Sequence, residues 1–432
     1  MKINLKNFGP IDTAENITVS PMTIFTGDEK SKSYLSVIMY SAIQSSFEIT
    51  YANLFRNISD TDDYHSLSKS VLQGFMQSFK EQWKNEINSF LKQEGVDILN
   101  SENVSITLES YNSNIIIDLN KMDNDKIKPE FLNYMADQIE DSMIFYSMIK
   151  SDSKKYIPFP KDVISIFCNT FLKELHGDNF SHPYFMPSVR KEVMRNYIPM
   201  TKRAMKLLSG AKGNNTDQYF NTSFYTDLAR NLININKKET NNIDILAINK
   251  IFESDTLNGK IKIIMPEVGL PIFKYRMDGE TNDIEMKDVP ESIASLASLS
   301  ILMRYHLNKN SRLFIEEPEI NLDSNKQKSL ADVMVKLVNN GVSLVATTKS
   351  TVLLKQIENA VKMSQSKKVN EVEKNIDKNL EELNINDVQL YSIEKKAKSG
   401  RFIVKNIPFD ITNGFSIKNM KIIANDEHVD ER

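Results

Sequence analysis

Two consecutive carboxylates, Glu316 and Glu317, stand at the end of an apolar segment, RLFIEEP, and are followed by Pro318. An apolar run that does not alternate is typical of a buried strand in a parallel sheet, and ligands bind at the carboxyl ends of such strands. There, one acid can hold Mg²⁺ through water and the second can orient a water that attacks a phosphoryl group. A solvated glutamate pair that merely ends a strand is the alternative, and these residues alone favour neither interpretation.

A second candidate is the segment IFTGDEKSKSYLSVIMYS, residues 24–41. An apolar strand runs into a loop with glycine, lysine and serine, and a helix with an apolar stripe follows. The phosphate-binding loop G-x-x-x-x-G-K-[ST] uses eight positions and places a second glycine before its lysine. Residues 27–33 supply seven positions, and Ser31 stands where that glycine belongs. The segment is therefore either a working nucleotide site or the remnant of one.

Strands and helices alternate around both candidates. The first residues predict three short strands, ending at Gly27, and an amphipathic helix over 33–48. From residue 291 the order is helix, strand, helix, strand, helix, and two strands close the chain. This alternation predicts an α/β fold with a mixed or parallel sheet flanked by helices. Residues 1–50 and 276–432 would form one domain, and 51–275 a largely helical insertion with short antiparallel strands.

Composition limits the class of protein. With 41% hydrophobic and 26% charged residues, the chain is typical of soluble globular proteins, and a net charge of -3 argues against attraction of the whole molecule to nucleic acid. The single cysteine, Cys168, excludes an internal disulfide, and the five histidines show no metal-ligand spacing. No apolar run approaches the ~20 residues of a membrane span, and the N-terminus lacks a signal peptide, so we expect a cytoplasmic protein.

Taken together, the two candidate segments resemble those of the ABC-type ATPase heads of the RecF, SMC and OLD-like group. The chain is most similar to compact bacterial AAA family proteins of this group, many of which come from phage-defence operons. The resemblance is carried by LKNFGPI with TIFTGDEKSKSYL, by YFMPSVR, LFIEEPEINL and GVSLVATTKSTVLLKQI, and by the closing VQLYSIEKKAKSGRFIVKNIPFD. It implies an ATPase head assembled from both ends of the chain, whereas no motif covers the helical middle.

The resemblance implies roles for residues of the phosphate loop. Gly27 would begin the loop, Lys32 would reach the β- and γ-phosphates, and Ser33 would ligate Mg²⁺. Lys30 would substitute for the lysine only as a charge. The shortened loop and Ser31 take backbone donors and conformational freedom away from the phosphate cradle.

It also implies roles at other strand ends. Glu316 would ligate Mg²⁺ and Glu317 would be the general base. Lys349, in ATTKS, replaces a histidine that senses the γ-phosphate, and would act on phosphate only as a point charge. At 289–293, VPESI replaces a Ser-Ser-Gly-Ile signature. Glu291 would repel a polyphosphate there, and an ordinary first helical turn is the favoured interpretation.

Arg190, in FMPSVRKEV, opens a basic stretch. The resemblance implies that it contacts phosphate or a dimer interface, and pairing with a nearby acid is equally favoured. Residues 190–212 hold Arg190, Lys191, Arg195, Lys202, Arg203, Lys206 and Lys212 against one acid, Glu192. Such a run can track a nucleic-acid backbone, although a solvated helical face is the favoured interpretation.

Three of the four nucleotide-contacting motifs are thus altered. The leading hypothesis is a pseudo-ATPase that serves as a structural, sensing or regulatory subunit of a bacterial phage-defence or DNA-transaction complex, with ATP and Mg²⁺ as candidate ligands. We expect a homodimer or pairing with a related head, an effector protein partner because no nuclease signature follows the head, and no membrane partner. One alternative is an active Mg²⁺-dependent ATPase with a divergent phosphate loop. Another is a nucleic-acid-binding module that uses residues 190–212.

Overall fold

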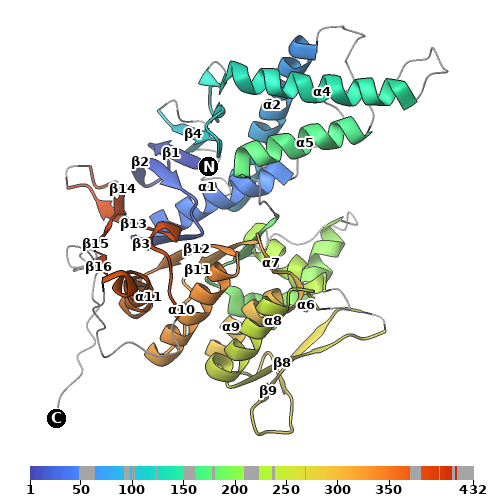
Figure 1. The fold of residues 1–432 in the computed structure, drawn as a ribbon. Helices are drawn as coiled ribbons and strands as arrows, with labels where there is room; N and C mark the ends of the chain where they lie inside the picture. Colours follow the sequence, from blue (N-terminus) through green and yellow to red (C-terminus); the bar gives the residue numbers. More distant parts are fainter. Residues whose placement is uncertain are drawn as a thin grey trace. The chain divides into compact units, whose positions relative to one another are not determined.

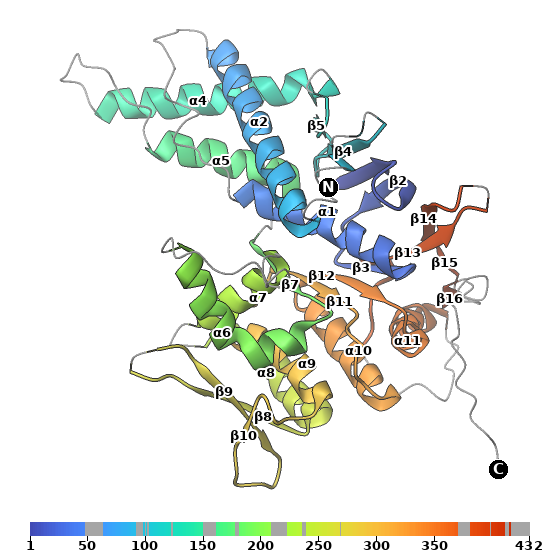
Figure 2. The ribbon, with the colours of Figure 1, turned by 180° about the vertical axis from the view of Figure 1, so that it is seen from behind.

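A computed structural model describes the chain except for residues 48–63, 92–97, 100, 102, 122–123, 150–160, 178–180, 209–222, 236–238, 268, 370–380, 398, 411–413 and 416–432. Its contacts divide the chain into two compact units, shown from opposite sides in Figures 1 and 2. Unit 1 comprises Met1–Thr18 and Val37–His182, and unit 2 comprises Val19–Ser36 and Pro183–Arg432. The three-part division at residues 50 and 275 stays a prediction.

Unit 1 combines antiparallel strands with long helices. Its strands are β1 (Lys2–Lys6), β2 (Ile11–Thr18), β4 (Ser105–Glu109), β5 (Ile115–Asp118) and β6 (Lys126–Ile127), in the order β6-β5-β4-β1-β2. Its helices are α2 (Tyr64–Leu91), α4 (Pro129–Ile149), α5 (Lys161–His176) and the later part of α1 (Glu29–Phe47). Of the short antiparallel strands predicted within residues 51–275, β4 and β5 pair with each other, and β4 alternates half-buried and buried residues because one of its faces packs on the core.

Unit 2 contains a mostly parallel set of strands. They are β3 (Met22–Gly27), β7 (Pro183–Met186), β11 (Arg312–Glu316), β12 (Ser343–Thr348), β13 (Val388–Lys395) and β14 (Phe402–Ile407). The order is β14-β13-β3-β12-β11-β7, and only β14 is antiparallel to its neighbour. Every residue of β11 is buried, which explains the unbroken apolar pattern.

Helices cover these strands. They are α6 (Arg190–Leu208), α7 (Ser223–Ile233), α8 (Ile243–Phe252) with the π-helical turn η4 (Glu253–Leu257), α9 (Glu291–Tyr305), α10 (Ser324–Asn339), α11 (Thr351–Val369) and the 3-10 turn η5 (Ile385–Asp387). Three further strands, β8 (Gly259–Ile264), β9 (Ile272–Met277) and β10 (Ile284–Glu285), form a small antiparallel sheet, and β15 (Phe409–Asp410) pairs with β16 (Gly414–Phe415). The prediction of a mixed α/β fold is confirmed.

The parallel register decides which residues meet. Thr26 of β3 pairs with Thr348 of β12, and Glu316 of β11 pairs with Thr347 of β12. Because these strands run in the same direction, their carboxyl ends form one edge of the sheet. That edge gathers the two candidate segments of the sequence, although nearly 300 residues separate them.

Candidate functional site at the strand ends of unit 2

The segment expected to be a phosphate loop is mostly helical. Strand β3 ends at Gly27 and helix α1 begins at Glu29, so Lys30, Lys32 and Ser33 lie in the first turns of the helix. The predicted helix start at residue 33 and a loop over 27–33 are therefore wrong. The reason is Asp28, whose carboxylate accepts hydrogen bonds from the Ser31 amide (3.0 Å) and the Ser31 hydroxyl (2.8 Å).

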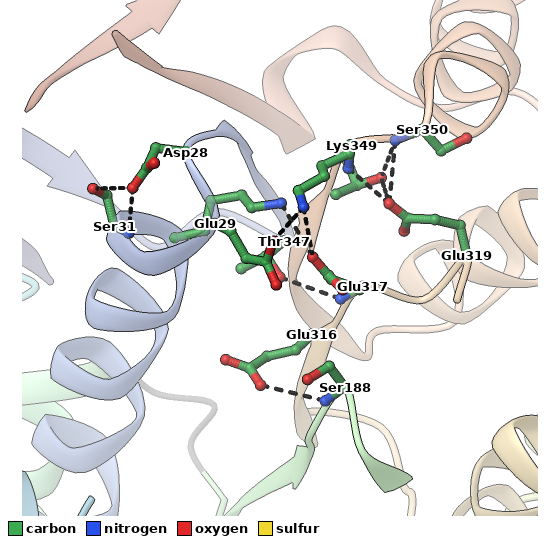
Figure 3. A network of polar contacts seen from close by, with 12 residues as sticks. Asp28, Glu29, Ser31, Ser188, Glu316, Glu317, Glu319, Thr347, Lys349 and Ser350 are labelled. Carbon is green, nitrogen blue, oxygen red and sulfur yellow. Dashed lines mark hydrogen bonds and ion pairs between the residues drawn. The ribbon is translucent and has the colours of Figure 1, made fainter. Parts of the chain in front are cut away.

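Asp28 thus caps α1, because a carboxylate at this position satisfies amides that the helix leaves unpaired. The Lys32 amide donates to the Asp28 carbonyl at 3.0 Å, which closes the first helical turn. A phosphate cradle needs several amides that point at the ligand. Here the protein's own carboxylate lies at that helix end, as Figure 3 shows. The sequence contained a signal for this helix start, because aspartate directly before a helix is a common cap.

The backbone at position 27 requires glycine for structural reasons. Its φ is +119°, and a Cβ added there would lie 2.4 Å from the Ile393 carbonyl oxygen of the neighbouring strand β13. Only glycine tolerates both the backbone conformation and this approach. Close packing against β13 therefore accounts for Gly27 without any ligand.

Glu317 adopts an unusual backbone conformation directly after β11. Its φ is +44°, in the left-handed region that side chains seldom enter. Its amide donates to both the carbonyl oxygen (2.9 Å) and the hydroxyl (3.2 Å) of Thr347. The surrounding structure therefore holds this turn in a strained conformation, which is common where a side chain must be aimed.

Arg190 holds the other side of the same turn. Its side chain is buried, with an exposed fraction of 1%. Its guanidinium donates to the carbonyl oxygens of Pro187, Ser295, Glu316, Glu317 and Pro318 at 2.8–3.2 Å. Burial lowers the pKa of Arg190 to about 10, while three nearby glutamates act in the opposite direction. Arg190 is thus neither a surface phosphate contact nor half of a simple ion pair, because its donors are used on the backbone.

An ion-pair network at the strand ends joins Lys32, Lys349, Glu29 and Glu317. Figure 3 labels the last three of these residues. The Lys32 ammonium is buried, and its Nζ lies 3.6 Å from Glu317 Oε1. Lys349 Nζ lies 3.8 Å from the same oxygen and 2.5 Å from Glu29 Oε2. Burial lowers the pKa of Lys32, against the attraction of Glu317. The structure therefore brings together the lysine, the general-base candidate and the sensor candidate, and pairs them with one another.

Glu316 is enclosed more completely than Glu317. Its Oε2 accepts from the Ser188 amide at 3.3 Å, and its buried Oε1 has no hydrogen-bond partner. Burial raises the pKa of Glu316, while hydrogen bonds from the Ser33 side chain and the Ser188 amide act against this rise. The two residues expected to ligate Mg²⁺, Ser33 and Glu316, are thus neighbours.

Glu319 is a site residue that sequence reasoning missed. Its Oε1 accepts from the Thr348 hydroxyl (2.8 Å) and the amides of Lys349 (2.7 Å) and Ser350 (3.2 Å). These amides precede α11, so a second carboxylate occupies the start of a second helix. The PEI segment after Glu317 carried the signal, because an acid three residues beyond a strand end can reach the neighbouring strand.

The arrangement suits the two candidate ligands differently. Carboxylate and hydroxyl oxygens are ligands that Mg²⁺ prefers, and Glu316 Oε1, which lacks a hydrogen-bond partner, lies beside the Ser33 hydroxyl. At both helix starts, the amides that could face a polyphosphate donate to Asp28 and Glu319 instead.

The remaining predicted contacts lie elsewhere. Glu291 begins α9, after Pro290, and pairs with Lys191 at 2.9 Å, in agreement with the helical-turn interpretation. In the basic stretch, the Arg195 guanidinium donates to the Val289 carbonyl at 2.9 Å. The side chains of Lys202, Arg203 and Lys206, and the whole of Lys212, lie outside the described residues. No group of three or more His, Cys, Asp or Glu side chains in the described part of the chain is arranged to hold a metal.

No family model matches the sequence, and no curated protein matches it. The chain is similar to solved structures of SMC heads. One is an SmcHead bound to the C-winged helix domain of ScpA, at 10% identity over 95% of this chain and 98% of that chain, with a TM-score of 0.39. An SMC head from Thermotoga maritima is 9% identical over 94% and 98%, with a TM-score of 0.34.

A third similar structure is the Smc head with an extended coiled coil, bound to the C-terminal domain of ScpA derived from Pyrococcus furiosus. It is 11% identical over 94% of this chain and 96% of that chain, with a TM-score of 0.33. The similarity to SMC heads thus extends over nearly the whole chain at low identity. Among the described residues, no helix is long and apolar enough to span a membrane.

Proposed function

We propose that this protein is an ATPase-like head whose nucleotide site has become an internal ion-pair network. It serves as a structural, sensing or regulatory subunit rather than as an ATP hydrolase. The observation that carries the proposal is the buried Lys32 ammonium, 3.6 Å from Glu317. In a working site this lysine would be free to meet phosphate and this glutamate would be free to orient water.

Charge supports the same conclusion. Glu29, Glu317 and Glu319 surround the two lysines, Lys32 and Lys349, so acids already outnumber bases where a polyphosphate would lie. A nucleotide would have to break both contacts of Glu317 and then remain beside uncompensated carboxylates. Like charges at such distances repel by kilocalories per mole where water is scarce.

The resemblance of the sequence motifs supports the setting of this function. Heads of that group pair with a second head, so we propose a homodimer or a pair with a related head, with effector chemistry on a partner protein. A bacterial phage-defence or DNA-transaction complex is the setting proposed on the same ground.

Isothermal titration of Mg·ATP tests the proposal, with Lys32→Ala and, as a control, Lys328→Ala, an exposed lysine of α10 outside the ion-pair network. We expect no binding at millimolar nucleotide for the wild type or either variant. Binding that Lys32→Ala abolishes and Lys328→Ala leaves intact would overturn the proposal.

An active ATPase is the second candidate, favoured by the buried Glu316 Oε1, which lacks a hydrogen-bond partner, in a carboxylate beside Ser33. In that case Glu317→Gln abolishes Mg²⁺-dependent release of phosphate, because the general base is lost. Turnover that survives Glu317→Gln, or that does not require Mg²⁺, excludes this candidate.

A further inference from the structure

Strands β8 and β9 form a ribbon whose orientation is fixed by one buried face. They pair from Gly259 with Met277 to Ile264 with Ile272. On the inner face, Phe273 and Tyr275 are buried, and the Tyr275 hydroxyl donates to the Leu257 carbonyl at 2.8 Å. Because side chains alternate along a strand, the intervening residues must face away from this core. Figures 1 and 2 show the ribbon at the edge of unit 2, beside α8 and α9.

The outer face of this ribbon gathers positive charge. Lys260 lies directly opposite Arg276, and Lys262 lies directly opposite Lys274. Like charges at directly opposed positions destabilise a sheet. Two such pairs in succession therefore work against folding, in a chain whose net charge is -3.

Neighbouring acids neutralise the face only in part. Asp283 pairs with Arg276 at 2.6 Å, but Glu285, opposite Lys274, pairs with Lys287 at 2.9 Å. For Lys260, Lys262 and Lys274, the described part of the chain contains no carboxylate within ion-pair distance. These three ammonium groups are available to an anion from outside.

The same face ends in apolar side chains. Ile264 and Ile272 are cross-strand partners with exposed fractions of 43% and 39%, and Met265 beside them is 42% exposed. The outer face thus carries two rows of cations and then an isoleucine pair at the end of the ribbon.

We propose that the outer face of the β8–β9 ribbon binds duplex DNA, with the ribbon in the major groove. The third strand, β10, pairs with β9 only at Lys274 and Tyr275, so the Ile264–Ile272 end of the sheet is a two-stranded ribbon. Such a ribbon fits that groove, the lysines contact the phosphates along its edges, and the isoleucine pair suits thymine methyl groups. The deep, narrow major groove of duplex RNA excludes a ribbon. This surface is separate from the ion-pair network and does not depend on whether nucleotide binds there.

Fluorescence anisotropy with a labelled DNA duplex, between about 50 and 200 mM salt, tests the proposal. Three phosphate contacts, from Lys260, Lys262 and Lys274, predict a slope of log K against log salt of about -2.7, and Lys262→Gln with Lys274→Gln reduces its magnitude by about 1.8. The matched control is Lys250→Gln with Lys328→Gln, two exposed helical lysines, which leaves the slope unchanged. No binding at low salt, or an equal loss in both double variants, would overturn the proposal.

Two further measurements make the test specific. Polyglutamate of equal charge should compete poorly with DNA, and equal competition would assign the face to an acidic protein instead. Ile264→Ser with Ile272→Ser should weaken binding at least threefold without changing the salt slope, because it removes groove contacts and no phosphate contact. Unchanged affinity would refute the groove placement. Thermal unfolding checks that each exposed-face variant stays folded.

Discussion

Replacing Arg190 by methionine should destabilise unit 2 by about 4 kcal/mol. The guanidinium makes five hydrogen bonds to backbone carbonyls, and a charged donor contributes at least ~1.5 kcal/mol per bond, or about 7.5 kcal/mol in sum. Burial lowers the pKa of Arg190 from 12.5 to about 10, and at ~1.4 kcal/mol per pH unit this offsets about 3.5 kcal/mol. The difference remains large because methionine leaves buried carbonyls without donors.

Urea unfolding followed by far-ultraviolet circular dichroism measures this loss, and Arg190→Lys is the informative companion. Lysine keeps the charge but cannot donate to five acceptors in a plane. We therefore expect Arg190→Lys to lower the free energy of unfolding by at least about half as much as Arg190→Met does. The single tryptophan, Trp83, lies in unit 1 and reports that unit separately by fluorescence. A loss below about 1 kcal/mol for Arg190→Met would refute the backbone-clamp interpretation and restore Arg190 as a candidate ligand contact.

Three other predictions concern the same edge of the sheet. Lys32→Met should raise the cost of the partly buried Glu317 carboxylate and lower the free energy of urea unfolding by about 2 kcal/mol, because Glu317 then keeps only its 3.8 Å contact with Lys349. Adding Glu317→Gln should recover part of that loss, and additive losses would contradict the pairing. Burial raises the pKa of Glu316 above its usual 4.5, so its contribution to stability is present below pH 4.5 and lost as the pH rises through the folded value. The free energy of unfolding of Glu316→Gln should therefore rise relative to that of the wild type as pH increases, by at most ~1.4 kcal/mol per pH unit. A difference that does not change with pH would refute this expectation. Gly27→Ala should cost about 3 kcal/mol of thermal stability through strain and its clash with Ile393, and a neutral effect would indicate that the glycine serves a ligand.

The sequence by itself predicted the class of fold and most of its elements. Unbroken apolar runs identified β3, β11 and β12 as buried parallel strands, and apolar spacing identified α9, α10 and α11 between or beside them. These are local properties, because period and composition decide whether a segment can bury one face or two. The sequence also indicated that Ser31 and the missing loop residue damage a phosphate cradle.

Only the tertiary structure decided which partners these side chains have. Three arrangements depend on contacts between segments up to 320 residues apart. Lys32 is buried against Glu317, Lys349 contacts Glu29, and the Arg190 guanidinium donates to the backbone of the turn after β11. Side-chain chemistry at one position does not reveal whether its partner is a ligand, a carboxylate or a backbone carbonyl. The reason is that a buried charge without a partner is costly, so it pairs with a group that lies within a few ångströms. The parallel register of the strands determines which groups lie that close.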